Sequence, residues 1–402
     1  MAADQSEIRA VAWTEVFPWL MIFRSFSLAI SMPMLALATL GVLLTPIGWL
    51  AGELVLPDQV ADVQVAPEIG ARHVWPVESR AWQRVRSTPS AIPIQGLRWT
   101  GPMQRVFTDG LQPFRHLFER DITWPLFAYY LIGGVWTLLI WSVLGGAMTR
   151  MAAVRLGRNE REGMFESLGF AMKRFVAYFG APLFPLLGIV VVVVMCLPVG
   201  WLIRWDPGVL IAGLLWFFVL VGSLLMMILL LGLAVGWPLM WGVTSVEEMG
   251  DIFEATQRSY SYTFGRPLRY LFYALLALLL GSAGFLLVQV FAEGVVALGG
   301  WAVSWGAGNA RLAALHAADT SLVLIGQTMI QLLNGLVFTV ASAYRYSFFW
   351  SAVAATYLLL RRDVDQTAFD DIYVLGVHER YGLPELSPDE NGVPGVPGDA
   401  EE

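Results

Sequence analysis

The sequence predicts an all-α membrane protein with about six transmembrane helices, and three observations support this. Hydrophobic residues make up 57% of the chain and charged residues only 14%, whereas a soluble globular domain carries about 25% charged residues. Several stretches without any charged residue exceed the ~20 residues needed to cross ~30 Å of hydrocarbon. They are Ser25 to Gly52, Ile122 to Thr149, Phe175 to Ile203, Pro207 to Val246, Tyr270 to Ala292 and Thr320 to Tyr344.

The third observation is an internal repeat. In the first copy Met164-Phe165-Glu166-Ser167 precedes Gly180-Ala181-Pro182-Leu183, and in the second Ile252-Phe253-Glu254-Ala255 precedes Gly265-Arg266-Pro267-Leu268. Each copy follows one apolar stretch and leads into another. The sequence therefore predicts two parallel units of span, surface helix and span, at 124–204 and 210–292.

The remaining segments follow from charge and proline content. Residues 1–25 alternate charges with aromatic rings, which favours the membrane interface, and the first span covers about 26–50. Residues 51–123 are polar and rich in proline, so we expect an extracytoplasmic loop or small subdomain, with a helix between Gln104 and Arg120. Residues 124–362 form a five-span bundle, and 363–402 an acidic, partly disordered tail.

The ends of the elements can also be predicted. The spans of the bundle are expected at about 124–148, 176–203, 210–235, 268–292 and 321–343, with an apolar helix continuing to Arg362. Gly236-Trp237-Pro238 should break the fourth stretch. Asn159 with Glu162, and Ser245 with Glu248, are candidate caps of the two surface helices. Pro182 and Pro267 suit the first turn of the span that follows.

Short loops set the orientation. Arginine and lysine concentrate in the loops after the second and fourth spans and at the carboxyl end. Because basic short loops face the cytoplasm, we expect a multi-pass protein of a bacterial inner membrane with both termini cytoplasmic. The lipid bilayer is the expected partner, together with a protein partner or a homo-oligomer, and nucleic acid is not expected.

The sequence offers no catalytic, metal-binding or cofactor-binding residues. Its histidines are scattered, and Cys196 is the single cysteine, which rules out a disulfide or cysteine metal site within one chain. The best candidate site is a polar face of the last span, where residues fall on one side of a helix: Gln327, Gln331, Asn334, Ser342 and Arg345. This face could line a transport path, although hydrogen bonding between helices is the favoured interpretation.

The second candidate is a pair of carboxylates, Glu166 and Glu254, which occupy equivalent places in the two copies. They could form a shared switch or ligand contact near the cytoplasmic surface. The favoured interpretation is a carboxylate early in a helix, opposite the positive end of the helix dipole.

The surface-helix motifs, the Gly-x-Pro-Leu pairs and the closing segment from Ala354 to Asp363 resemble uncharacterised bacterial multi-pass proteins. These are similar to the membrane domain attached to some glycerophosphodiester phosphodiesterases and, more distantly, to Yip1-type membrane proteins. The resemblance covers about residues 124–371. The chain departs from it by the 51–123 insertion and by lacking a phosphodiesterase domain, so the resemblance implies no enzymatic activity and no site residues.

Together these observations predict a non-enzymatic integral membrane protein, a structural or interaction component that organises the membrane or partner proteins. The alternative is a transporter or channel for a small solute or lipid that uses the polar face of the last span. A membrane-embedded lipid enzyme is the weakest class, because the spans contain no paired histidine or aspartate near the interface.

Overall fold

The structure is a computed structural model that describes residues 17–55, 101–110, 112–117, 122–308, 311, 321–374, 387–388 and 394–395. It divides into two units, Met1–Ile372 and Tyr373–Glu402. In the second unit β1 (Ser387–Pro388) pairs antiparallel with β2 (Pro394–Gly395). The predictions for residues 1–16, for most of the 51–123 loop and for disorder in the tail lie outside the described residues.

Six helices of the first unit are long and apolar enough to cross a membrane. They are α3 (Met32–Val55), α8 (Trp124–Gly157), α10 (Phe175–Leu202), α11 (Asp206–Val246), α13 (Pro267–Ala307) and α15 (Ser321–Asp365). The prediction of a helical, multi-pass membrane protein is therefore confirmed.

Shorter helices lie between and against these spans. They are η1 (Pro18–Leu20), α2 (Met21–Ala29), α6 (Gly101–Asp109), α7 (Gln112–His116), α9 (Met164–Lys173) and α12 (Ile252–Gly265). Helix α2 packs on α13 and α15, while α6 packs on the same two helices and α7 on α8. The helix predicted between Gln104 and Arg120 is thus found as two short pieces.

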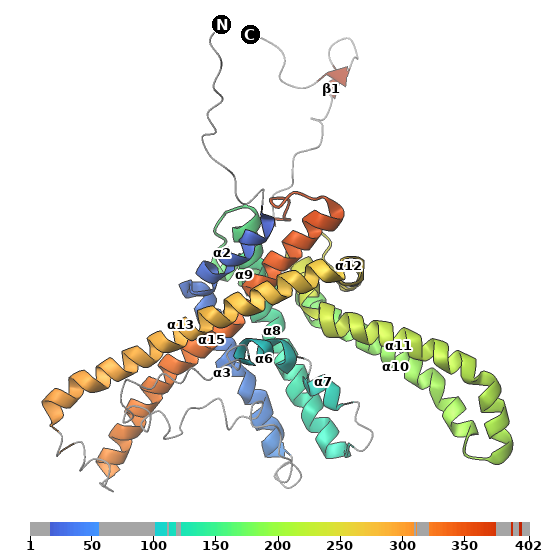
Figure 1. Cartoon of the computed structure of the whole chain (residues 1–402), viewed down its shortest axis with the longest axis horizontal. Helices are drawn as coiled ribbons and strands as arrows, with labels where there is room; N and C mark the ends of the chain where they lie inside the picture. The colour runs from blue at the N-terminus through green and yellow to red at the C-terminus, as the bar shows by residue number, and fades with distance from the viewer. Residues whose placement is uncertain are drawn as a thin grey trace. The chain divides into compact units, whose positions relative to one another are not determined.

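The core forms where α8, α11 and α15 meet. The indole rings of Trp241 and Trp350 stack there with centroids 4.3 Å apart. They fit because Gly145 presents no side chain: a Cβ at that position would lie 2.6 Å from Trp241. From this core the pairs α10–α11 and α13–α15 run outward in different directions (Figure 1).

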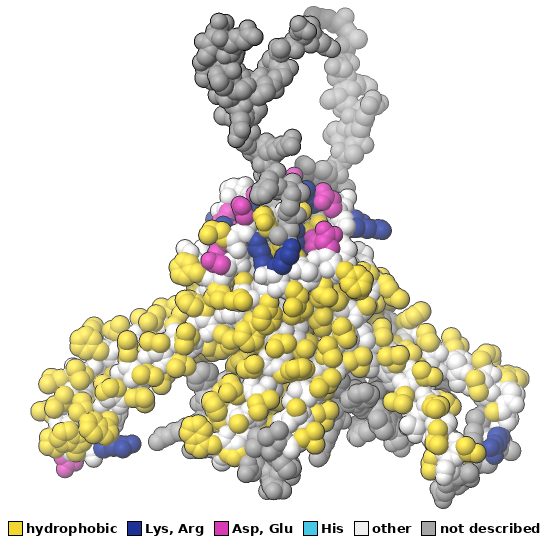
Figure 2. Space-filling model, turned by 180° about the vertical axis from the view of Figure 1, so that it is seen from behind, with side chains coloured by type: hydrophobic (Ala, Val, Ile, Leu, Met, Phe, Trp, Pro, Cys, Tyr) yellow, Lys and Arg dark blue, Asp and Glu magenta, His cyan; other side chains and the backbone are white. Residues whose placement is uncertain are grey.

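Charged side chains of the described residues gather at one end of the first unit, and hydrophobic side chains cover most of the rest (Figure 2). The charged end carries α9, α12 and the carboxyl end of α15 (Figure 1). Helices α9 and α12 therefore lie at the charged end, apart from most of the exposed apolar surface of the long helices.

Three predicted helix limits were wrong. The first span does not run unbroken from 26, because the chain bends at Ile30 and Ser31 between α2 and α3. Helix α13 continues past 292 to Ala307. The apolar helix that was expected to continue the last span to Arg362 is part of α15, which runs without a break to Asp365. The helices also exceed the bilayer: 41 residues in α11 measure about 61 Å at 1.5 Å per residue.

The third wrong limit was the break at Gly236-Trp237-Pro238, because α11 passes through Pro238 as a continuous helix. Pro238 has no N–H for the carbonyl of Ala234 four residues earlier, and side chains of α12 and α13 bind the next two carbonyls along the chain, a kind of contact that helps a span to tolerate proline. Here Ser259 Oγ donates to the carbonyl of Gly236 at 2.6 Å. Tyr270 Oη donates to the carbonyl of Val235 at 2.7 Å.

Three predicted helix ends were also wrong. Asn159 lies in the left-handed region at φ 58°, and α9 begins after Gly163. Ser245 lies inside α11, where its Oγ donates to Trp241 O, and α12 is capped by Asp251 Oδ1, which accepts from Glu254 N at 2.7 Å. Pro182 lies within α10, so only Pro267 occupies a first turn as predicted.

Candidate functional site

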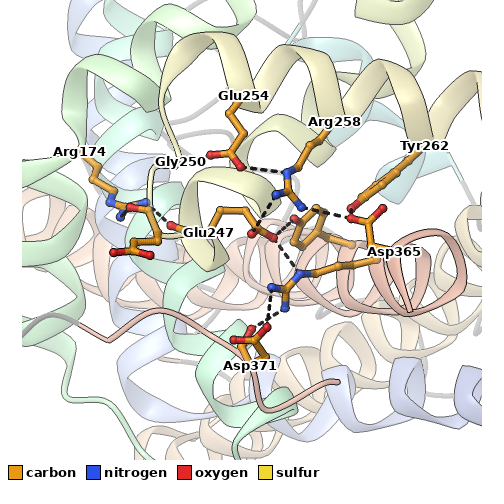
Figure 3. Close-up of polar contacts among 11 residues, drawn as sticks. Arg174, Glu247, Gly250, Glu254, Arg258, Tyr262, Asp365 and Asp371 are labelled. Carbon is orange, nitrogen blue, oxygen red and sulfur yellow. Dashed lines mark hydrogen bonds and ion pairs between the residues drawn. The ribbon is translucent and has the colours of Figure 1, made fainter. Parts of the chain in front are cut away.

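A buried carboxylate organises the charged end. Glu247 directly follows α11 and is 7% exposed. Its Oε1 accepts a hydrogen bond from Tyr357 Oη at 2.5 Å and lies 2.8 Å from Arg361 Nε (Figure 3). Its Oε2 lies 3.5 Å from Arg258 Nη2. One side chain therefore joins the end of α11 to α12 and α15.

Further ion pairs extend this arrangement, which we name the Glu247 cluster. Arg258 Nε lies 2.9 Å from Glu254 Oε1 and Arg258 Nη1 lies 3.1 Å from Asp365 Oδ2. Arg361 Nη1 donates to the carbonyl of Asp371 at 2.5 Å. The cluster comprises Glu247, Glu254, Arg258, Tyr262, Tyr357, Arg361, Asp365 and Asp371.

Two side chains of the cluster, Arg258 and Tyr262, have raised pKa values. Burial by itself would lower the pKa of Arg258, but the charges of Glu247 and Glu254 outweigh burial and raise it. Burial raises the pKa of the Tyr262 phenol, and the hydrogen bond to Asp365 raises it further. Arg258 therefore stays charged and Tyr262 stays neutral at physiological pH.

A third arginine binds the carboxyl end of α11 directly. Arg174, between α9 and α10, donates from Nη1 to the carbonyls of Thr244 at 3.0 Å and Glu247 at 2.6 Å. These carbonyls have no helical partner of their own. Gly250 adopts φ +48° beside Arg174, a backbone conformation that favours glycine, and a Cβ there would lie 2.1 Å from Arg174 Nη1.

A second buried pair serves the first surface helix. Arg150 on α8 is 1% exposed, lies 2.9 Å from Glu162 Oε2 and donates to the carbonyl of Ser245 at 2.8 Å. Ser167 Oγ donates to Glu162 Oε1 at 2.9 Å. Each surface helix is thus preceded by a loop carboxylate, Glu162 or Glu247, that pairs with a buried arginine.

Glu166 and Glu254 lie at the amino ends of α9 and α12. Glu166 Oε2 accepts from Gly163 N at 3.4 Å, and Glu254 Oε2 accepts from Gly250 N at 2.8 Å. These contacts agree with the interpretation favoured from the sequence, in which each carboxylate lies early in a helix and binds its amino end. The two carboxylates differ in one respect, since Glu254 also pairs with Arg258 whereas Glu166 is exposed.

A cavity of about 560 Å³ lies between the spans, and we name it the central cavity. Its walls come from α3, α6, α7, α8, α10, α11 and α15. Aromatic side chains dominate them, among them Trp49, Trp141, Trp237, Trp241, Tyr346, Phe349 and Trp350. The charged side chains among the described lining residues are Arg105 and Arg345.

The structure divides the polar face predicted on the last span. Ser342 and Arg345 line the central cavity, whereas Gln327, Gln331 and Asn334 are not among its lining residues. The latter three are partly exposed, nearer the amino end of α15. The five residues therefore do not form one site.

Arg345 is the charged residue of the predicted polar face. It lies within α15, where its Nε donates to the carbonyl of Ser342 at 3.1 Å. Its guanidinium carbon is 5.5 Å from the ring centroid of Phe285 and 5.8 Å from that of Tyr346. Facing a cavity instead of lipid lowers the cost of this charge, which is about 2.5 to 3.5 kcal/mol at the bilayer centre.

The sequence missed the two buried pairs. Arg150 and Arg361 follow long apolar stretches, and their charge alone predicts only a position at the membrane surface. The signal that could have identified them is the recurrence of a carboxylate in the loop before each surface helix, Glu162 and Glu247.

No known family model matches the chain, and neither does any curated protein or solved structure.

Proposed function

We propose that this protein is a non-enzymatic structural or interaction component of a bacterial inner membrane. The observation that carries the proposal is the exposed apolar surface of the helix pairs α10–α11 and α13–α15. In the most apolar 18-residue window of α11 no residue is buried by the rest of the chain. Such surfaces are covered by lipid or by another membrane protein.

The ion pairs at the charged end support the same proposal. Glu247 and Arg361, like Arg150 and Glu162, are buried and engaged with each other. Removing one member of a buried pair costs about 3 to 5 kcal/mol, so these groups hold the spans in position. The two ion pairs fix the ends of the long helices relative to one another, as a structural component requires.

The surface helices support an interfacial position for the charged end. Phe165 on α9 is 80% exposed and Phe253 on α12 is 63% exposed, and Lys173 is exposed at the end of α9. Apolar rings beside basic groups suit the headgroup level. We assign this end to the cytoplasm, as the basic loops indicate. A cysteine placed at Glu160 in a Cys196→Ser background should then react with an impermeant maleimide only after the cells are opened.

Transport of a small solute or lipid is the second candidate, and the central cavity favours it. Ser342 and Arg345 line that cavity, so part of the predicted polar face is positioned to contact a solute inside it. The resemblance to the membrane domain attached to some glycerophosphodiester phosphodiesterases also remains a proposal. It implies no enzymatic activity for this chain.

Reconstitution into sealed vesicles separates these candidates. The purified full-length chain should leave entrapped fluorescent anions and potassium inside at the rate of protein-free vesicles, and should leave the lipid composition unchanged by mass spectrometry over a day. Flux that depends on protein and is removed by Ser342→Trp would favour transport and overturn the structural proposal. Conversion of a lipid would overturn it in favour of an enzyme.

A further inference from the structure

We infer that the central cavity binds an amphiphilic anion, a carboxylate or phosphate head group on an apolar chain, and that Arg345 binds the head group. The cavity, about 560 Å³, falls within the range of roughly 300 to 1,000 Å³ that small-molecule sites occupy. This inference concerns binding alone and does not depend on the proposed structural role.

The charge of the cavity selects the head group. Arg105 and Arg345 are among the described lining residues, and that set contains no aspartate or glutamate. Within the described part of the chain, Arg345 contacts the carbonyl of Ser342 and two aromatic rings, and has no carboxylate partner. An arginine in apolar surroundings is stabilised by an anion, and its planar guanidinium fits a carboxylate or phosphate.

The hydroxyl groups of the lining point to the same class of ligand. Thr45, Thr137 and Thr339 each donate to the backbone carbonyl four residues before them, at 2.7 to 2.8 Å. Ser342 Oγ donates to Thr339 O at 2.8 Å. These hydroxyl hydrogen atoms are already engaged. The Nη groups of Arg345 therefore face the cavity together with the indole N–H groups of Trp237 and Trp350, which have no hydrogen-bond partner among the described residues. All of these donors require a hydrogen-bond acceptor in the ligand.

The walls select the apolar chain. Apart from the two arginines, the cavity is lined mainly by tryptophan, phenylalanine, proline, leucine and valine side chains. Filling such walls with an apolar body removes surface from water at about 25 cal/mol per Å². A small inorganic anion would leave them unfilled, whereas an acyl chain would cover them.

Palmitate is a suitable probe, with monopalmitin as the uncharged head-group control and acetate as the control without a chain. Native mass spectrometry of the full-length protein in neutral detergent should show one bound palmitate per chain, and tryptophan fluorescence should give the affinity. A hydrogen bond to a charged group is worth about 1.5 to 3 kcal/mol, so Arg345→Gln should weaken palmitate binding roughly tenfold to a hundredfold. It should leave monopalmitin binding unchanged.

Three further variants keep the test decisive if Arg345→Gln folds poorly. Arg345→Lys should retain part of the affinity, Ser342→Trp should abolish binding by filling the cavity, and Arg204→Gln, which removes an exposed arginine, should bind like the parent. Equal binding of palmitate and monopalmitin, or palmitate binding unaffected by Arg345→Gln and Ser342→Trp, would overturn the inference. Acetate binding as tight as palmitate would overturn its apolar part.

Discussion

Replacing Glu247 by glutamine removes the central charge of the Glu247 cluster while keeping its shape and its ability to accept a hydrogen bond from Tyr357. Glu247 and Arg361 are 7% and 6% exposed, and removing one partner of such a pair costs about 3 to 5 kcal/mol. Arg361 keeps its contacts with Asp371, and Arg258 keeps those with Glu254 and Asp365. We therefore expect a loss near the lower limit, about 3 kcal/mol.

The assay is reversible unfolding in mixed micelles of dodecyl maltoside and sodium dodecyl sulfate, followed by circular dichroism. Glu160→Gln is the matched control, because Glu160 pairs with Arg158 at 3.3 Å but its side chain is 58% exposed. An exposed pair is worth about 0 to 1 kcal/mol. The double variant Glu247→Gln, Arg361→Met should recover part of the stability lost in Glu247→Gln, since it no longer buries an unpaired charge. If Glu247→Gln cost no more than Glu160→Gln, the reasoning about the charged end would be refuted.

Three other predictions follow from the packing and the helix ends. Gly145→Ala should lower the free energy of unfolding by about 1 to 3 kcal/mol through overpacking, since its Cβ would lie 2.6 Å from Trp241. The control Gly213→Ala, whose Cβ would meet no atom within 4 Å, should be neutral or stabilising. Equal effects of the two substitutions in thermal unfolding would contradict this prediction. Asp251→Ala should cost about 1 kcal/mol in the same assay by removing the cap of α12, and no loss would show that the cap is dispensable. Burial raises the pKa of Tyr260 to about 12, above its usual ~10, so the neutral phenol stabilises the folded state below pH ~10 and this contribution is lost as the pH rises through about 12. The melting temperature of the parent should therefore fall more steeply than that of Tyr260→Phe over this range, and parallel curves would contradict the assignment.

Composition and uncharged stretches were sufficient to predict the helical, multi-pass class, because crossing hydrocarbon demands length and apolarity in each segment separately. Helix limits were harder, because they depend on neighbours. Pro238 indicates a break when it is considered alone, yet α11 continues because Ser259 and Tyr270 bind the nearby carbonyls. Those donors lie over twenty residues further along the chain, so no local pattern contains them.

The candidate sites show the same limit. The positions of Glu166 and Glu254 at helix starts follow from local spacing, and both accept backbone N–H groups there. The central cavity could not be predicted, because its walls combine residues as distant as Thr45 and Trp350. Gln327 and Arg345 both lie on α15, and helical spacing puts them on one side of that helix. Only Arg345 lines the central cavity, because the neighbouring helices decide which part of that side faces it.

Native mass spectrometry of the protein, extracted gently with its own lipids, tests the proposed role most directly. The account predicts a defined assembly larger than one chain, held through the exposed surfaces of α10–α11 or α13–α15, with Phe217→Ala on the exposed side of α11 reducing it and Glu160→Gln leaving it intact. A lone chain at native abundance, with no protein partner and with protein-dependent solute flux in vesicles, would contradict the account.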